Sequence, residues 1–313
     1  MSQRKATLPL TESREKRNGY IFSIASYGLW GLLPIYWHSM AKIAPLEVLS
    51  HRVLWSAILM IGVMTVLRQW RSITTLLKSR KTSLTVTACA LLISTNWLVF
   101  IWAISVDRTL ETSLGYFINP LLNVLVGAFI LRERLSRLQI AAVALAALGV
   151  LYAIFAAGHL PWIALVLAGS FTAYGYLRKI MAADSLTGLT AETCLLLPLA
   201  IAGVIWFWIF EGMAFGTHIG AEPSLFNIVL LVGSGPITAA PLLLFAAGAR
   251  RLPLSTMGFL QYLAPSLMFI ISVALFHEAL TPEALITFLC IWSGIALYIL
   301  DNIRKQRTTK API

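Results

Sequence analysis

The sequence predicts an all-α membrane protein of ten transmembrane helices, arranged as two inverted five-helix repeats with both termini in the cytoplasm. Of its 313 residues, 58% are hydrophobic and 12% are charged, whereas a soluble domain carries roughly a quarter charged residues. The apolar residues gather in runs of about 20, the length that crosses a bilayer as a helix. A pattern of residues is also written twice, 145 positions apart.

The apolar sequence divides into ten runs. They lack the two-residue alternation of barrel strands, and in lipid a helix satisfies every backbone hydrogen bond within the segment. The polar residues 1–18 precede the first run, which ends in bulky Tyr36, Trp37 and His38 rather than a cleavage site, so we expect it to be retained. The runs are 19–38, 46–67, 83–105, 112–131, 137–156, 161–181, 189–210, 226–248, 255–276 and 283–301.

The duplicated pattern has five residues, with identical spacings of 13, 2, 1 and 13 in its two copies. Five apolar runs lie on each side of Gly158. Because five is odd, the second half sits in the membrane upside down relative to the first, which is a physical route to alternating access. The first copy is Pro120, Glu133, Leu135, Ser136 and Gly149, and the second is Pro265, Glu278, Leu280, Thr281 and Gly294.

The basic residues give the expected orientation. Of the 24 lysines and arginines, all but Lys42, Arg52 and Arg108 lie in alternate connections counted from the N-terminus. Basic loops resist translocation, so these connections and both termini are expected in the cytoplasm. The net charge of +11 is thus a topology signal, and we expect no nucleic-acid partner. The expected parts are a cytoplasmic tail (1–18), two repeats (19–157 and 158–303) and a basic cytoplasmic tail (304–313).

Polar and aromatic side chains within the runs mark a candidate binding site. A central charge costs roughly 2.5–3.5 kcal/mol, so such groups tend to face protein or a wet cavity. The segments 94–96 and 233–238 lie at matched positions in the two halves, which points to a central site. Helix packing, a kink and interhelical hydrogen bonds are the alternatives. The substrate-binding candidates are Trp30, Asn96, Trp102, Tyr116, Asn119, Tyr174, Thr238, Gln261 and Tyr262.

Four ionisable residues are candidates for gating or proton coupling: Glu47, His51, Arg52 and Glu192. Glu47 and His51 lie one helical turn apart at the outer end of the second run, with Arg52 beside them. Their alternative role is an interfacial cluster whose charged ends reach out to water. For Glu192, the alternative to proton transfer is an acid at the cytoplasmic interface.

Several functional classes lack a signature in this sequence. There is no GxxxxGK[ST] loop for ATP, and the HExxH and GxSxG motifs of hydrolases are absent. The three cysteines, Cys89, Cys194 and Cys290, are odd in number and show no metal-binding spacing. We therefore expect no cofactor, no metal and no enzymatic activity.

The duplicated pattern resembles the EamA repeat of the drug/metabolite transporter superfamily, and further stretches are similar to RarD-type members of that family. Together they extend from residue 19 to residue 301, although 233–241 has no clear counterpart. The stretches contain Tyr27 to Gly31, Pro34, Tyr36, Trp37, Pro45 to Glu47, His51, Arg52, Trp55, Ser56, Asn96, Trp97, Trp102, Ala103, Ser113 to Leu121, Tyr174, Gly175, Arg178, Lys179, Arg251, Leu252, Leu254, Ser255, Gly258, Gln261 and Tyr262.

The resemblance implies two inverted EamA repeats around a central cavity, in the bacterial cytoplasmic (inner) membrane. It implies a secondary transporter that moves small organic metabolites or drugs by alternating access. The expected partners are a small-molecule substrate and membrane lipid, with protons as a candidate coupling ion. A non-transporting polytopic membrane protein, such as a sensor or an assembly factor, is the alternative.

Overall fold

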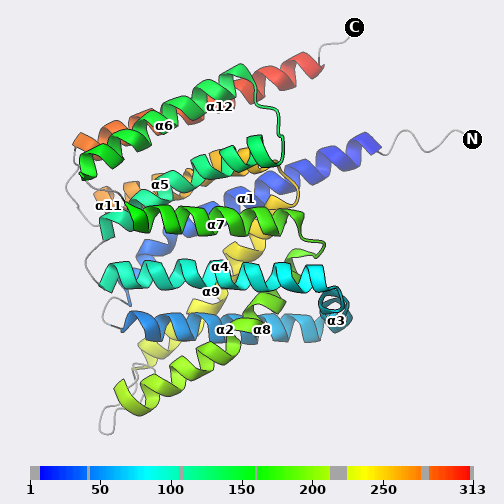
Figure 1. The fold of residues 1–313 in the computed structure, drawn as a ribbon, viewed down its shortest axis with the longest axis vertical. Helices are drawn as coiled ribbons and strands as arrows, with labels where there is room; N and C mark the ends of the chain where they lie inside the picture. Colours follow the sequence, from blue (N-terminus) through cyan, green and yellow to red (C-terminus); the bar gives the residue numbers. More distant parts are fainter. Residues whose placement is uncertain are drawn as a thin grey trace, which may run out of the picture.

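The computed structural model describes residues 8–40, 43–105, 109–158, 161–211, 224–275 and 282–310, and its regular elements in these ranges are helices (Figure 1). Each of the ten predicted runs falls on a helix or a pair of consecutive helices. The elements are α1 (Leu8–His38), α2 (Pro45–Val66), α3 (Trp70–Lys78), α4 (Arg80–Ser105), α5 (Thr109–Leu125), the π-helical turn η1 (Val126–Ile130), α6 (Arg137–Ala157), α7 (Trp162–Ile180), α8 (Ser185–Trp206), the π-helical turn η2 (Phe207–Glu211), α9 (Leu225–Ala249), α10 (Leu254–Gln261), α11 (Leu263–Ala274) and α12 (Pro282–Lys310).

Six helical segments in the described part of the chain are long and apolar enough to cross a membrane. Two shorter apolar helices, Leu114–Ile130 and Leu285–Asp301, accompany them. The long helices α1 and α12 also include the charged residues of the predicted tails, which dilute their mean hydropathy. The helices therefore extend beyond the apolar runs that marked them.

Two features of the helices differ from the sequence prediction. The ninth run, expected as one helix over 255–276, is divided at Tyr262 into α10 and α11. Pro265 lacks the N–H that would bond to the carbonyl of Gln261, so the helical ladder is broken at this point. The second difference is α3, a short helix in a predicted basic connection, which buries Ile73 and Leu76.

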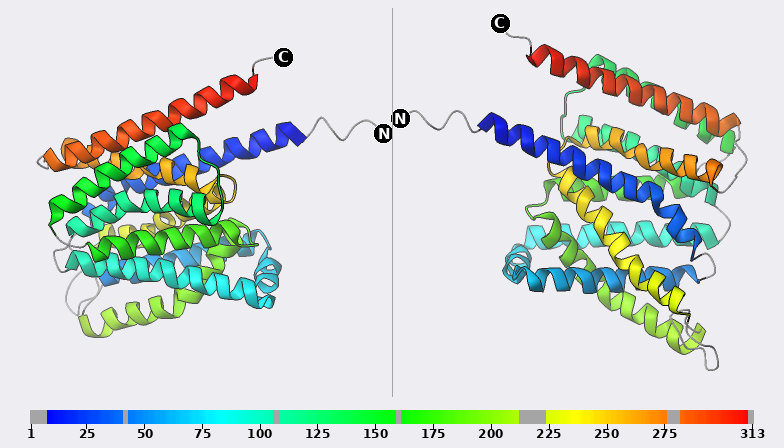
Figure 2. Two further views of the ribbon diagram at one scale, coloured as in Figure 1. Left: turned by 45° about the horizontal axis from the view of Figure 1, so that its top comes forward. Right: turned by 180° about the vertical axis from the view of Figure 1, so that it is seen from behind.

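The connections rich in basic residues gather at one end of the bundle. Figures 1 and 2 show that α1 begins and α12 ends there, and that α3 and the α5–α6, α7–α8 and α9–α10 connections lie at the same end. We call this the basic end, and the opposite one the far end. The turn after α6 lies at the far end, where Gly158 takes a φ of 74° that an L side chain rarely adopts.

The helix pairings are preserved when the two halves are exchanged. The first half contains α1, α2, α4, α5 and α6, and the second contains α7, α8, α9, α10 with α11, and α12. Equivalent helices pair directly: α6 with α12, α2 with α8, and α5 with α10. The other contacts also come in matched sets. The first helices, α1 and α7, each pack on the third and fourth helices of the opposite half: α1 on α9 and α11, and α7 on α4 and α5. The second helices, α2 and α8, each pack on the third helix of the opposite half, α9 and α4 respectively.

The glycines that end the duplicated pattern make reciprocal contacts between α6 and α12. A Cβ atom at Gly149 would lie 3.0 Å from the carbonyl oxygen of Thr287, and one at Gly294 would lie 2.7 Å from the carbonyl oxygen of Ala142. Ala142 and Thr287 are themselves 145 residues apart. The glycines therefore allow close helix packing at two sites related by the repeat.

The serine of the first copy has a capping role. Ser136 precedes α6, and its hydroxyl accepts a hydrogen bond from the Gln139 backbone N–H at 3.2 Å, while the Gln139 side chain accepts from Ser136 N at 3.0 Å. This reciprocal capping box stabilises the first turn of the helix. Glu278, Leu280 and Thr281 of the second copy lie outside the described residues.

The glutamate of the first copy connects the two halves. Glu133 accepts hydrogen bonds at 2.6–2.8 Å from the backbone N–H groups of Leu254 and Ser255 and from the Ser255 hydroxyl. An ionised carboxylate at a helix N-terminus satisfies unpaired N–H groups and interacts favourably with the helix dipole. Glu133 is thus a cap for α10 supplied by the other half of the chain.

Candidate functional site

An aromatic cluster joins α1, α7 and α9 in the middle of the bundle. The Trp30 ring lies 5.5 Å from that of Phe171 and 5.7 Å from that of Phe245, measured between centroids. The Tyr174 ring stacks on Phe245 with an interplanar angle of 17°. Two predicted site residues, Trp30 and Tyr174, are therefore brought together through these phenylalanines. Aromatic pairs in this distance range add about 0.5–1.5 kcal/mol each beyond area burial.

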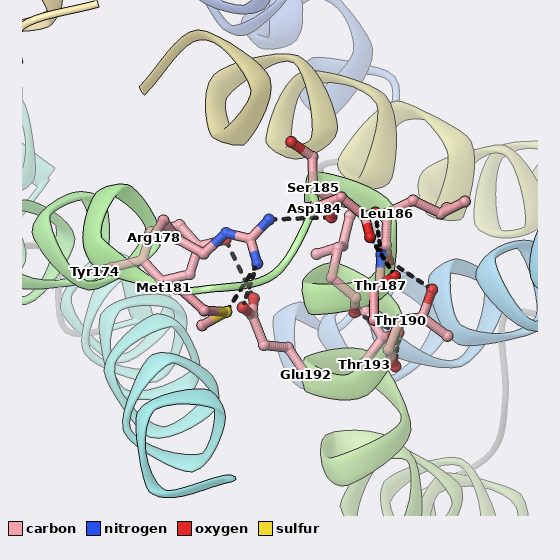
Figure 3. Close-up of polar contacts among 11 residues, drawn as sticks. Tyr174, Arg178, Met181, Asp184, Ser185, Leu186, Thr187, Thr190, Glu192 and Thr193 are labelled. Carbon is pink, nitrogen blue, oxygen red and sulfur yellow. Dashed lines mark hydrogen bonds and ion pairs between the residues drawn. The ribbon is translucent and has the colours of Figure 1, made fainter. Parts of the chain in front are cut away.

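A buried ion pair lies beside this cluster, toward the basic end. Figure 3 shows the Arg178 guanidinium of α7 pointing at the Glu192 carboxylate of α8, at 3.1 Å, and at the Ser185 carbonyl oxygen, at 3.0 Å. The Tyr174 hydroxyl donates to the other Glu192 oxygen at 3.2 Å. Both charged side chains are 2% exposed, so Glu192 is not an exposed interfacial acid.

Arg178 is a residue that the sequence prediction missed as part of the site. With Lys179 it belongs to the basic residues that predict the cytoplasmic side of the membrane. The signal that could have found it is its distance of 14 residues from Glu192 across a short connection, which allows two helix ends to pair their charges. Lys179 beside it donates to the carbonyl oxygens of Ala249 and Leu252, which ties α7 to the end of α9.

The turn into α8 is fixed by its N-cap. Asp184 accepts hydrogen bonds from the Thr187 backbone N–H at 2.9 Å and from the Thr187 hydroxyl at 2.5 Å. Burial raises the pKa of the Asp184 carboxyl, but the bonds from Thr187 and the nearby backbone outweigh it, so the pKa lies below its usual value. A hollow of about 510 Å³ at the basic end, lined by residues of α3, α4 and this turn, lies apart from the aromatic cluster.

A second cationic centre lies nearer the far end, on α2. The Arg52 guanidinium sits 4.6 Å from the ring centroid of Trp37 and 5.0 Å from that of Trp97. Its Nε–H donates to the Thr238 hydroxyl of α9 at 3.0 Å. No carboxylate of the described residues forms an ion pair with Arg52. The predicted residues Arg52 and Thr238 are thus in direct contact.

Other predicted residues surround this centre. Glu47 and His51 are buried on the same helix, and the Trp55 indole N–H donates to His51 Nδ1 at 3.2 Å. Tyr116 of α5 is 38% exposed, and its ring lies 6.3 Å from that of Phe100 between centroids. Asn96 is one residue from Trp97 on α4. Its side-chain amide donates to α7, at 2.8 Å to the Leu167 carbonyl oxygen and at 3.0 Å to the Ser170 hydroxyl.

The predicted amides Asn119 and Gln261 form an interhelical network. Asn119 of α5 donates to the Ala168 carbonyl oxygen at 2.7 Å and to the Thr172 hydroxyl at 3.1 Å, and it accepts from the Gln261 amide. Asn123 donates to the Gln261 side-chain oxygen at 2.6 Å. The network joins α5, α7 and α10, in keeping with the hydrogen-bonding alternative.

Two predicted residues lie apart from these groups. Tyr262 is buried against Ala146 and Ile291, and its hydroxyl donates to the Phe117 carbonyl oxygen at 3.4 Å. Trp102 lies near the end of α4 and is 43% exposed, with its ring 5.6 Å from that of Trp162. Neither residue contacts Arg52 or the aromatic cluster through the interactions described above.

The glycine- and proline-rich stretch of α9 does not interrupt its helix. The helix continues through Pro236 and Pro241. A Cβ atom at Gly235 would lie 2.5 Å from the Trp55 backbone carbon, and the Ser56 hydroxyl donates to the Gly235 carbonyl oxygen at 3.0 Å. The stretch therefore permits close packing of α2 on α9, which brings Arg52 to Thr238.

Comparison with known proteins identifies the family of this chain. The sequence profile of the EamA-like transporter family matches residues 17–155. Protein RarD of Escherichia coli K12 is 41% identical over 298 residues, which cover 95% of this chain and 99% of that protein. This chain is a RarD-type member of the EamA-like transporter family. It is accordingly a multi-pass protein of the bacterial inner membrane.

Further relatives of this EamA member carry transporter or RarD names. An "Uncharacterized transporter" of Vibrio cholerae is 41% identical, with 94% of this chain and 95% of that protein covered. A "Chloramphenicol-sensitive protein RarD" of Pseudomonas aeruginosa is 36% identical, with 92% and 96% covered. A solved crystal structure shares the fold, with a TM-score of 0.69, 17% identity, and 91% and 98% of the two chains covered.

Proposed function

We propose that this EamA protein is a secondary transporter that moves small organic metabolites or drugs by alternating access. Its scaffold would be ten transmembrane helices in two inverted repeats, 19–157 and 158–303, with both termini cytoplasmic. The family and the transporter names of its relatives support a transporter of drug/metabolite type. Chloramphenicol, named in the Pseudomonas aeruginosa relative, is one compound to test.

The reciprocal glycine contacts are the observation that carries this proposal. Contacts in which two equivalent positions exchange partners are the signature of a two-fold axis, and Gly149 with Thr287 and Gly294 with Ala142 have that relation. The paired helices α6 and α12 run in opposite directions, since the first starts and the second ends at the basic end (Figure 2). A two-fold axis that relates two antiparallel helices is perpendicular to them. For helices that cross the membrane, this axis lies in the membrane plane, which supports inversion of the halves.

The charge distribution supports the orientation. The basic end holds the connections in which lysine and arginine are concentrated, and the positive-inside rule assigns such an end to the cytoplasm. The far end, with Gly158, then faces outward. Two inverted bundles of this kind can rock against each other around a fixed central site.

The substrate site would lie between the aromatic cluster and the Arg52 centre. Trp30 and Tyr174 offer ring surfaces, and Asn96, Tyr116 and Thr238 offer polar atoms near the Arg52 centre. The remaining predicted residues have supporting roles in this proposal. They are Asn119, Gln261 and Tyr262 for helix packing, Trp102 for the outer end of α4, and Glu47, His51 and Glu192 for gating or proton coupling.

The contacts at the basic end would form the cytoplasmic gate. Glu133 caps α10 from the opposite half, and Lys179 ties α7 to the end of α9. The Glu133 bonds join the two halves and must break if the halves separate at this end, whereas the Lys179 bonds hold α7 and α9 together within the second half. The Glu133→Gln variant removes the charge of the cap and is expected to favour opening toward the cytoplasm.

Cysteine labelling tests alternating access without knowledge of the substrate. In a variant lacking Cys89, Cys194 and Cys290, single cysteines replace Ser23, near the basic end, and Ser234, on the far-end half of α9. We expect a membrane-impermeant maleimide to label the first from the inside and the second from the outside. Addition of Glu133→Gln should raise labelling of the first and lower labelling of the second.

The opposite result would support a sensor or an assembly factor. Such a protein has no need to expose its core alternately to the two sides, so neither buried cysteine would react, or Glu133→Gln would change both in the same direction. Uptake of chloramphenicol and of a metabolite panel into proteoliposomes then tests transport itself.

A further inference from the structure

No described residue provides a counter-ion for Arg52. A charged group within the membrane is expensive, and such groups usually pair with one another or mark a substrate pathway. Arg52 has two indole rings and one hydroxyl group around it and no acidic partner among the described residues. Cation–π contacts offset part of the cost, about 0.5–2 kcal/mol each, but they do not neutralise the charge.

The donors of the guanidinium are only partly used. Its Nε–H bonds to Thr238, while no described residue accepts a hydrogen bond from its two terminal nitrogens. Those nitrogens present parallel N–H groups, which match the two oxygens of a carboxylate in a bidentate pair. The rings of Trp37 and Trp97 lie near the guanidinium, and a ring face accepts no conventional hydrogen bond.

The second helix of the other half, α8, also carries a charged residue, and there the charge has a partner of opposite sign. Arg52 lies eight residues after the N-cap of α2, Ala44, and Glu192 lies eight residues after the N-cap of α8, Asp184. Since α2 and α8 are the second helices of their halves, the two charges lie equally far from the starts of corresponding helices, while the 145-residue offset of the duplicated pattern pairs Glu192 with Glu47. Glu192 is neutralised by Arg178 of the preceding transmembrane helix. Beside Arg52, the preceding transmembrane helix α1 supplies Trp37, which has no charge.

We propose that the anion missing at Arg52 is a carboxylate of the transported molecule. The inference rests on the proposed transport function and names its substrate class, a small organic carboxylate. The terminal nitrogens of Arg52 bind the carboxylate. The body of the substrate then lies toward Asn96 and the aromatic ring of Trp97, both on α4.

Thermal unfolding of the purified full-length protein tests this proposal. The probes are bacterial carboxylic acids and amino acids, each paired with its primary amide, which has nearly the same size but no carboxylate. We expect at least one acid to raise the melting temperature of the wild type in a concentration-dependent way, with its amide inactive. Arg52→Gln should weaken that acid's binding at least tenfold, since hydrogen bonds to charged groups contribute about that much, and Arg52→Lys should weaken it less.

The matched control is Arg251→Gln, which also removes one arginine but from an exposed pair with Glu15. It should leave binding of the acid unchanged. An acid that binds wild type and Arg52→Gln equally, or a panel in which no acid binds, would overturn the proposal. Inorganic phosphate or phosphatidylglycerol provides a further test. If either raises the melting temperature as much as the acids do, and the effect is lost in Arg52→Gln, the proposal is also overturned, because the ligand would then be a general oxyanion or a lipid headgroup.

The two proposals fail in different ways. Neutral amides that bind wild type and Arg52→Gln alike would refute a carboxylate substrate and leave transport in place. Transport itself is refuted by the cysteine labelling, which involves no ligand. A carboxylate that binds at Arg52 in a protein without alternating access would support the site and indicate a sensor.

Discussion

The two charged centres of this protein, Arg52 near the far end and Arg178 with Glu192 near the basic end, occupy related places in the two halves and are built differently. Arg178 and Glu192 neutralise each other in a buried pair to which Tyr174 also donates. Arg52 is held between two tryptophans and a threonine. One centre thus contains both of its charges, whereas no acidic partner of the other lies among the described residues. The first is suited to structure, the second to recognition.

The largest expected effect comes from breaking the complete centre. Arg178→Gln leaves Glu192 buried without its cation, and removal of one partner of a buried pair costs about 3–5 kcal/mol. We expect a corresponding loss in the free energy of unfolding, measured in detergent by denaturant titration. The double variant Arg178→Gln and Glu192→Gln should recover most of the loss, because no charge is then left unpaired.

The control for this prediction is again Arg251→Gln, whose exposed ion pair is worth about 0–1 kcal/mol. A double variant as unstable as Arg178→Gln alone would contradict the explanation by charge. The loss would then come from the hydrogen bond to the Ser185 carbonyl oxygen and from packing.

A smaller effect is expected from the packing that positions Arg52. At Gly235, a Cβ atom would lie 2.5 Å from the backbone carbon of Trp55 and 2.8 Å from the backbone nitrogen of Ser56. Backbone atoms cannot move aside cheaply, so Gly235→Ala should force α2 away from α9 and destabilise the protein by about 1–3 kcal/mol. It should also weaken binding at Arg52, because Thr238 lies on the displaced helix.

Gly62→Ala is a matched control on α2 itself, since no atom lies within 4 Å of a Cβ there. That variant should be neutral or more stable by up to about 1 kcal/mol, the difference in helix propensity. Equal losses in the two glycine variants would show that helix flexibility, rather than the α2–α9 contact, sets the effect.

The sequence predicted the arrangement of helices better than the roles of their side chains. Apolar runs about as long as a bilayer is thick located every transmembrane candidate, because length and hydropathy are properties of a segment by itself. The duplicated glycines were detected by spacing, although their use in packing α6 on α12 became clear only from the contacts. The break at Tyr262 depends on Pro265, whose local effect can be predicted in principle.

The site residues were harder to interpret because their partners come from distant segments. Asn119 and Gln261 are 142 residues apart and hydrogen-bond directly, and nothing local in the sequence indicates that pairing. Glu133 is known from the sequence only as a member of the duplicated pattern, and its bonds to Leu254 and Ser255 give it a role between the halves. A polar residue in a span therefore predicts a side chain that faces away from lipid. Whether it contacts other protein groups or a water-filled cavity depends on the tertiary fold.

The smallest expected change in stability, and the sharpest contrast with Arg178, is for Arg52→Leu. The substitution removes two cation–π contacts and one hydrogen bond, but it also removes a partly buried cation that has no acidic partner among the described residues and whose desolvation is costly. These effects oppose each other, so we expect the free energy of unfolding without ligand to change by no more than about 1 kcal/mol. Arg178→Leu, measured alongside, should lose several times as much. If the two leucine variants are equally unstable, Arg52 is a structural cation like Arg178, and the difference between the two centres is not one of function.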